Sequence, residues 1–169
     1  TILCLPEISD NAMNAAWGTM PGAGLRCSEP HRDTQDRTEH QGTGAFTVSI
    51  ADAAHIVEAD YFGVESCNKV ADKFAHSGLT ASKAETVDSL SSTSFRSAWN
   101  ADSSSIRTVN TDAALSQGGH VTADESVMGD GKIDMSKVNA IAFDPYTHGY
   151  YKVTERVDEA FRDGLKLKK

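Results

Sequence analysis

The sequence lacks the patterns that mark several large classes of protein. It has three cysteines, an odd number without C-x-x-C spacing, which indicates neither a disulfide framework nor a zinc site. No window approaches the roughly 18 apolar residues of a membrane span, and the first residues do not read as a secretory signal. We therefore expect a protein of the reducing cytoplasm that has no membrane partner.

Positive charge is also scarce. Lys and Arg number 16 against 24 Asp and Glu, for a formal net charge of −8, and the one basic run is Lys166, Lys168 and Lys169. Nucleic acids and anionic membranes are bound through basic patches that release counterions. Neither partner is expected, and the basic run is interpreted as a solvated tail.

Metal-binding and nucleophile motifs are missing as well. The six histidines never pair at i, i+4 or with a cysteine cluster. Gly129 to Asp134 resembles a calcium loop, but its spacing puts Lys137 where a bidentate Glu is required, so a β-turn is the better interpretation. There is no P-loop, G-x-G-x-x-G or G-x-S-x-G motif either. We expect no metal site.

The chain is long enough for one domain, residues 1–169, with a hydrophobic content of 39%. The clearest strand is Ala45 to Ile50, where apolar and polar residues alternate. Asp52 then caps a helix whose apolar residues recur at helical spacing and which ends at Gly63.

The first thirty residues predict short strands. An apolar run from Thr1 to Leu5 is stopped by Pro6, and Ile8 to Asn14 carries the turn formers Ser9, Asp10 and Asn11. We predict a strand, a turn and a second strand that ends at residues 15–18. A weak strand covers Leu25 to Ser28, and Pro30 stands where a helix can begin.

Residues 86–123 contain nine Ser and five Thr among 38 residues, a composition typical of a linker. A structureless loop of this length is uncommon inside a compact domain, so we predict several strands. Beyond it we expect a helical turn at 134–140, a strand at 141–143, a turn at Pro145 and Tyr146, and a helix from Val153 to Asp163 closed by Gly164.

Three stretches carry a family resemblance. They are residues 11–18 (NAMNAAWG), residues 45–79 with AFTVSIADAAHIVEADYFGVES and DKFAHSGLT, and residues 123–166 with ADESVMGDGKIDMSKVNAIAFDPYTHGYYKV and AFRDGLK. In this order and spacing, the chain resembles the flavin reductase and flavoredoxin family.

The resemblance implies a mainly β fold: a six-stranded Greek-key split β-barrel with a few peripheral helices. It also implies a homodimer that binds FMN non-covalently at the subunit boundary. The leading function is an NAD(P)H-dependent flavin reductase, and the alternative is an FMN electron-transfer protein. A third class, a barrel without cofactor that serves as a structural or assembly module, is kept open by departures from the family pattern.

The same resemblance implies the site residues. Asn14, Ala15, Ala16 and Trp17 would line the flavin ring and ribityl chain, and Ser28, His31, Arg32 and Thr34 would form a phosphate-binding turn. A helix N-terminus with such donors suits a phosphate. Lys73 and Phe74 of a partner would cover the ring, and His148 would line its open face beside Tyr150 and Tyr151.

Alternatives stand beside these assignments. Arg32 can be a solvated surface cation, and Trp17 can be a plain core aromatic. Asp36 and Arg37 stand where the family usually has an Asn and an apolar residue, and an added carboxylate weakens phosphate binding. The dimer interface is expected to draw on Ala45 to Ile50 and on the helix end at Tyr61 and Phe62.

Overall fold

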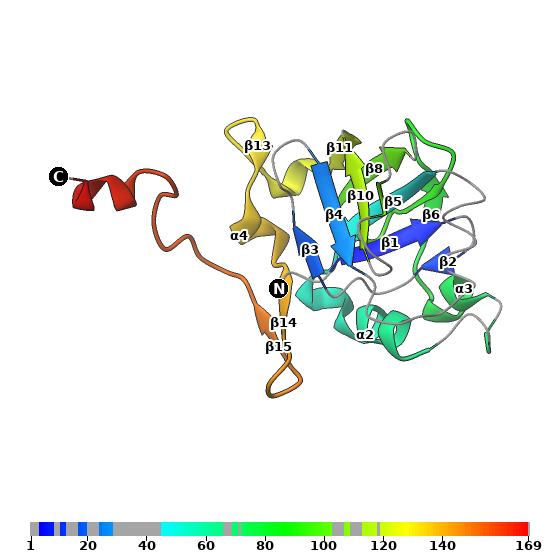
Figure 1. The fold of residues 1–169 in the computed structure, drawn as a ribbon. Helices are drawn as coiled ribbons and strands as arrows, with labels where there is room; N and C mark the ends of the chain where they lie inside the picture. The colour runs from blue at the N-terminus through cyan, green and yellow to red at the C-terminus, as the bar shows by residue number, and fades with distance from the viewer. Residues whose placement is uncertain are drawn as a thin grey trace.

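The fold is mainly β, as expected, with short helices at its periphery (Figure 1). The computed structural model describes residues 4–8, 11–12, 17–19, 24–28, 45–65, 69–70, 72–102, 107–108, 113–117 and 119–168, and side chains within 45–65, 69–70, 72–98 and 120–168. Its strands form two larger antiparallel sheets and three two-stranded hairpins.

The larger sheet has five strands in the order β11-β8-β5-β1-β2. Their bounds are β1 Cys4–Ile8, β2 Asn11–Ala12, β5 Ala45–Ile50, β8 Ser97–Asp102 and β11 Gly119–Ala123. The predicted strand at Ala45 to Ile50 is therefore confirmed, and it is the central strand of this sheet.

Both faces of β5 are buried, including the polar one. Thr47 and Ser49 are as inaccessible as Phe46 and Val48. The Thr47 hydroxyl donates a hydrogen bond of 2.7 Å to the Leu90 carbonyl, which offsets the cost of removing it from water. This arrangement rules out part of the predicted dimer interface, because β5 side chains are already covered within their own chain.

The second sheet has four strands in the order β3-β4-β10-β9. Their bounds are β3 Trp17–Thr19, β4 Gly24–Ser28, β9 Arg107–Thr108 and β10 Ala113–Gln117. Strand β10 lies against β8, which brings the two sheets together (Figure 1). The described strands leave both sheets open, so the predicted six-strand barrel closure is not seen among them.

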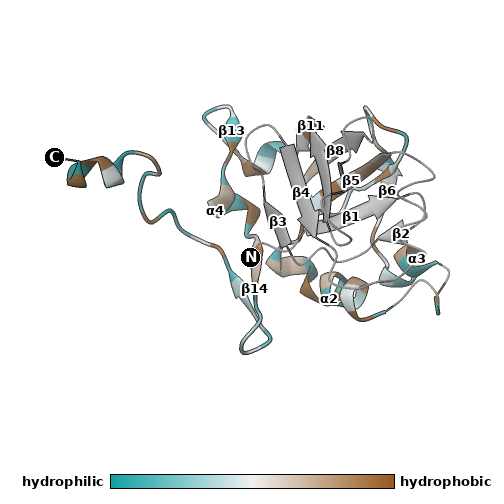
Figure 2. Ribbon diagram, viewed as in Figure 1, coloured by the Kyte–Doolittle hydropathy of each residue, from teal (hydrophilic) through white to brown (hydrophobic). Residues whose placement is uncertain are grey.

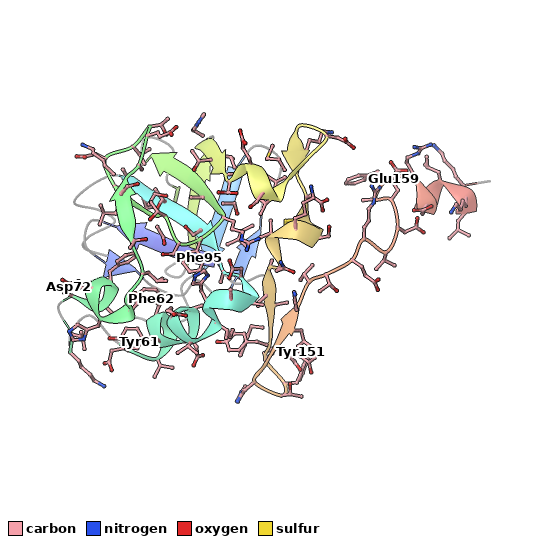
Figure 3. The ribbon with its side chains drawn as sticks, turned by 180° about the vertical axis from the view of Figure 1, so that it is seen from behind. Tyr61, Phe62, Asp72, Phe95, Tyr151 and Glu159 are labelled. Atoms are coloured by element: carbon pink, nitrogen blue, oxygen red, sulfur yellow. The ribbon has the colours of Figure 1, made fainter. Side chains whose placement is uncertain are left out.

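The first core cluster lies under the helices. Asp52 caps the start of this helical segment, as predicted, because its carboxylate accepts hydrogen bonds from the N–H groups of Ala54 and His55 at 2.9 and 3.1 Å. The helices are η1 Ala53–His55, α2 Ile56–Val64 and α3 Lys73–Ser77. Helix α2 ends one residue beyond the predicted Gly63, and its Phe62 packs with Phe74 and Phe95 in the core, as Figure 3 shows for Phe62 and Phe95.

Lys73 has an unusual place for a lysine, because only 2% of the residue is exposed. Its ammonium donates hydrogen bonds of 3.1 and 3.0 Å to the carbonyls of Phe62 and Glu65, and it lies 5.9 Å from the centre of the Phe62 ring. The last carbonyls of a helix lack partners within it and carry the negative end of its dipole. Lys73 thus caps α2.

None of the described helices has the length and apolar character of a membrane span.

Three hairpins complete the described β structure. The hairpins pair β6 Ala81–Lys83 with β7 Leu90–Ser92, β12 Met128–Gly129 with β13 Lys132–Ile133, and β14 Ile141–Asp144 with β15 Gly149–Lys152. The β-turn interpretation of 129–134, the strands within 86–123 and the turn at Pro145 are confirmed.

A second core cluster supports the later hairpins. Ile50 packs with Val127, Val138 and Ala140. The short helices η3 Glu125–Val127 and α4 Met135–Val138 supply two of these residues, and α4 confirms the predicted helical turn at 134–140.

The predicted helix from Val153 to Asp163 is wrong. Residues 153–162 form no helix, and Gly164 lies inside the short helix η4 Asp163–Leu167 instead of closing an earlier one. Val153 packs against the core, but Val157 and Phe161 are 93% and 97% exposed. Most helices in proteins depend on packing of their apolar face, and the described chain offers this one no surface.

Two expectations for the first strands also need correction. Pro6 lies within β1 and is paired with Val48 of β5. Among the described residues β2 pairs only with Glu7 and Ile8, so Pro6 has no described partner on its other side. Residues 17–19 do not continue the second strand but form β3 of the other sheet. The strand near Leu25 to Ser28 is confirmed as β4, whereas the helix expected at Pro30 falls outside the described residues.

We predict that Lys73→Met lowers the free energy of unfolding by about 1–3 kcal/mol, because it leaves two helix-end carbonyls without their donor. The exposed Lys83, whose pair with Asp88 is at the surface, gives a matched control. Lys83→Met should change stability by less than about 0.5 kcal/mol. Urea unfolding followed by circular dichroism measures both, and equal effects would show that Lys73 is not a cap.

We also predict that Ser97→Ala stabilises the protein by about 1 kcal/mol, because the buried Ser97 hydroxyl has no hydrogen-bond partner among the described residues. Ser92 is the matched case, since it is equally buried but donates to the Thr80 carbonyl at 3.3 Å. Ser92→Ala should therefore lower stability. Thermal melts of the two variants test the contrast, and a loss of the same size at both positions would contradict it.

Candidate functional site

Two of the sequence-predicted site segments meet at one end of the four-stranded sheet. Trp17 of β3 and Ser28 of β4 are register partners, and Ser28 is also paired with Ala113 of β10. The Cα atoms of such partners lie about 4.5–5.5 Å apart. The chain therefore enters β3 at Trp17 and leaves β4 at Ser28 at the same end of the sheet.

Those two segments hold most of the predicted residues. Asn14, Ala15 and Ala16 come directly before Trp17, and His31, Arg32 and Thr34 come shortly after Ser28. All six lie outside the described residues. The pairing of Trp17 and Ser28 is described, and the roles of these six residues stay predictions.

Helix α3 lies against β2, the strand that leads into Asn14 (Figure 1). The third predicted segment, which holds Lys73 and Phe74, thus lies beside the strand that leads into the first predicted segment, residues 14–17. Asp72 begins α3 by accepting the Ala75 N–H at 2.9 Å, and Gly78 ends it with a positive φ of 74°. Both ends of α3 therefore follow the usual capping pattern of an α-helix, with Asp at the start and Gly at the end.

Lys73 and Phe74 do not present themselves to a ligand in this structure, contrary to their predicted role. The Lys73 ammonium is occupied by the end of α2, and the Phe74 ring stacks on Phe62 at 5.9 Å with an interplanar angle of 26°. Both side chains serve the core of their own chain. The sequence did not predict that Lys73 caps α2, because its two carbonyl acceptors come within reach only when α2 and α3 pack together.

His148 lies at the exposed turn of the β14–β15 hairpin. Its φ of 55° is left-handed, and its ring lies nearly parallel to that of Phe143, 6.3 Å away with an interplanar angle of 8°. Hydrogen bonds from the Thr147 hydroxyl and the Tyr146 N–H hold the pKa of the Asp144 carboxyl below its usual value and shape the turn. The hairpin thus exposes an imidazole on an aromatic support.

Tyr150 links this hairpin to α2. Its hydroxyl donates a hydrogen bond of 2.6 Å to the Asp60 carboxylate, and its ring contacts Phe143 at 5.6 Å. Burial, followed by that bond and the charge of Asp60, raises the pKa of the Tyr150 hydroxyl above its ordinary value. The phenol therefore stays protonated at neutral pH and serves as a donor. The partner Asp60 was not predicted, because it lies ninety residues away in the sequence.

A cavity of about 230 Å³ lies where the β6–β7 hairpin meets β8 and β11. Hydroxyl groups of Ser91, Thr93 and Thr122 line it, and Arg96 faces the carboxylate of Asp124. Hydrogen bonds from Ser126 and the charge of Arg96 lower the pKa of Asp124. This cavity was not predicted from the sequence, and it is smaller than the roughly 300–1,000 Å³ typical of organic ligand sites.

Comparison with known proteins yields matches only at the level of structure. No protein-family model and no curated protein matches the sequence. Flavoredoxin of Desulfovibrio vulgaris (Miyazaki F) superposes with a TM-score of 0.86 and 31% identity, over 97% of this chain and 92% of that one.

Two further structures share the fold. Flavoredoxin from Methanosarcina acetivorans has a TM-score of 0.83 and 17% identity, with 98% of this chain and 91% of that one covered. The FMN-binding domain of a flavin reductase-like enzyme from Shewanella baltica has a TM-score of 0.79 and 16% identity, over 94% and 88%. The predicted resemblance is confirmed, and since the identity with a flavoredoxin exceeds 30% over nearly the whole of both chains, this chain belongs to the flavin reductase and flavoredoxin family.

Proposed function

We propose that this protein is a non-covalent FMN-binding oxidoreductase, and most specifically an NAD(P)H-dependent flavin reductase. The observation that carries the proposal is the match at 31% identity over 92% of a flavoredoxin. The FMN-binding domain from Shewanella baltica, which shares the fold, adds support.

The described geometry fits a flavin at the Trp17–Ser28 end of the second sheet. Register pairing at this end brings together the segment proposed for the flavin ring and the segment proposed for the phosphate. Because Lys73 is occupied as a helix cap, the positive charge for the phosphate falls to Arg32, with Ser28 and Thr34 as further donors. Helix α3, which also contacts α2, lies against β2, the strand that leads into the segment proposed for the flavin ring.

FMN, when bound, would supply the hydride and electron-transfer chemistry. The chain itself has to bind the phosphate, orient the ring and leave one face open to the nicotinamide. His148, on its Phe143 support, is the described side chain that we assign to the open face. Tyr150 holds that hairpin on α2 and is a positioning residue.

An FMN electron carrier is the second candidate function. Two flavoredoxins are among the most similar structures, so this reading has direct support. The two functions share the cofactor and differ in the electron donor. A homodimer is also part of the proposal. Strand β5 and Phe62 are buried within one chain, so of the predicted interface only Tyr61 remains partly exposed. The Lys73 and Phe74 side chains are engaged in the core of their own chain.

We predict that added FMN is bound with quenching of its fluorescence, and that denaturation releases it intact. Arg32→Ala should weaken binding roughly tenfold or more, because a charge-assisted hydrogen bond contributes about 1.5–3 kcal/mol. Arg37→Ala, five residues away, is the control and should leave affinity nearly unchanged. A protein that fails to quench FMN would remove the cofactor and favour the structural module.

We further predict steady oxidation of NADH or NADPH when free FMN is supplied in excess, followed at 340 nm on the order of minutes. A bound flavin that stays oxidised with both nucleotides, but is reduced by a ferredoxin-like donor, would instead establish the carrier. His148→Ala should slow reduction by the nucleotide while leaving FMN affinity within about twofold. An unchanged rate would exclude His148 from the open face.

A further inference from the structure

The cavity of about 230 Å³ beside the β6–β7 hairpin is lined by residues from 82–85, 91–98 and 122–124, and we call it the hairpin cavity. None of its described lining residues belongs to the segments proposed for the flavin. Strand β5, the hydrophobic strand that pairs with β8 (Figure 2), contributes nothing to the described lining either. The hairpin cavity is thus a polar space that the function proposed above does not use.

The strand side of the hairpin cavity carries a guanidinium. Ser97 pairs with Ala123, and the Asp124 N–H donates to the Arg96 carbonyl at 2.9 Å, so the ladder of β8 and β11 continues to Arg96 and Asp124. Register partners share a face of the sheet, and so do residues two apart on one strand. Arg96 and Asp124 therefore lie on the same face as Thr122, and all three line the cavity.

Arg96 differs from the other charged residues that line the hairpin cavity. Those others already have described partners: the pairs are Lys83 with Asp88 at 3.0 Å, Glu85 with His120 at 3.8 Å, and Asp124 with the Ser126 N–H at 2.8 Å. The charge of Arg96 acts on Asp124, but its guanidinium makes no ion pair or hydrogen bond within the described part of the chain. The donor fork of a guanidinium matches the two oxygens of a carboxylate. The unpaired Arg96 is thus suited to bind an anion.

The hairpin side of the cavity presents hydroxyl groups. Ser82 and Ser91 are register partners on β6 and β7, and their hydroxyls make no hydrogen bond with any residue that the structure describes. Across from them, the Thr122 hydroxyl donates to the Ala98 carbonyl at 3.3 Å, which leaves its oxygen able to accept. The cavity therefore offers donors and acceptors together, which is what the hydroxyl groups of a ligand require.

Size and charge narrow the choice of ligand. At roughly 30 Å³ for each water-sized group, 230 Å³ holds about seven or eight of them. The unpaired Arg96 balances a single negative charge, whereas a second one would meet the carboxylates of Glu85 and Asp124. A phosphate carries more than one negative charge at neutral pH and is disfavoured. A short carboxylate with a single charge meets both conditions.

We propose that the hairpin cavity binds a small hydroxylated monocarboxylate, with the carboxylate on Arg96 and the hydroxyl groups of the ligand on Ser82, Ser91 and Thr122. The inference goes beyond the proposed function and does not rest on the flavin, because the two sites share no described residue. Glycerate is a suitable probe, since it carries a carboxylate and neighbouring hydroxyl groups on about seven non-hydrogen atoms.

Isothermal titration calorimetry of the full chain without FMN tests the site. Glycerate should bind with a dissociation constant of about 1 mM or tighter, and Arg96→Gln should weaken binding by roughly tenfold or more, because a charge-assisted hydrogen bond is lost. Arg156→Gln changes an exposed arginine outside the cavity and should alter affinity by less than about twofold. Both arginines are exposed, so circular dichroism should report an unchanged fold.

Either of two results would overturn the site. One is glycerate that produces neither heat nor chemical-shift changes at concentrations up to about 50 mM. The other is an equal loss of affinity in Arg96→Gln and Arg156→Gln, which would place the anion elsewhere.

Related probes test the two halves of the ligand. Propionate lacks the hydroxyl groups and glycerol lacks the carboxylate, so each should bind roughly tenfold more weakly than glycerate. Ser91→Ala should weaken glycerate binding about threefold or more and leave propionate nearly unchanged. Propionate that binds as tightly as glycerate would overturn the hydroxyl contacts, and phosphate that binds more tightly would overturn the single charge. The FMN titration is decided separately, and its failure would leave this site standing.

Discussion

Burial of β5 on both faces is the constraint on which the rest of the structure depends. A polar strand face can enter the interior only if its hydroxyl groups find acceptors, and Thr47 finds one in the Leu90 carbonyl of β7. That bond requires the β6–β7 hairpin to lie over this face. At the end of β5, the Ala51 carbonyl accepts the Ile141 N–H at 3.1 Å, and Asp52 starts the helical segment. The position of β5 therefore places both the later hairpin and α2.

The helical segment formed by η1 and α2 is held at its two ends by opposite charges. Asp52 accepts N–H groups at the start of η1 and pairs with the His55 Nδ1 at 2.9 Å, whereas the Lys73 ammonium binds the carbonyls at the other end of α2. Each charge lies where the helix dipole favours it. The His55 ring also meets Phe95 edge-on at 5.4 Å. Charged caps and aromatic packing thus fix a helix whose outer face remains available.

Local signals in the sequence identify those elements whose chemistry is local. The alternation at 45–50, the cap at Asp52 and the turn at 129–132 each depend on neighbouring residues, and each prediction is confirmed. The Lys73 cap and the Tyr150–Asp60 bond join residues eight to ninety positions apart, which no local pattern reveals.

Periodicity alone misleads where packing decides. The spacing of Val153, Val157 and Phe161 suits one helix face, but a face needs a surface to cover it. The described part of the chain supplies none beyond Val153. The Ser- and Thr-rich strands show the reverse case. Several of their hydroxyl groups donate to backbone carbonyls, as when Thr122 donates to Ala98 at 3.3 Å. For the candidate site, the convergence at Trp17 and Ser28 follows from pairing that residue spacing does not encode.

The β14–β15 hairpin is anchored more firmly than its exposed turn suggests. Backbone hydrogen bonds tie its base to the core, since Ala53 donates to Asn139 at 3.1 Å and Val153 to Ala140. The Tyr150 hydroxyl ties the same hairpin to α2. These bonds fix the position of the hairpin on both sides of its turn. The conformational freedom of residues 153–168 therefore begins only after Val153.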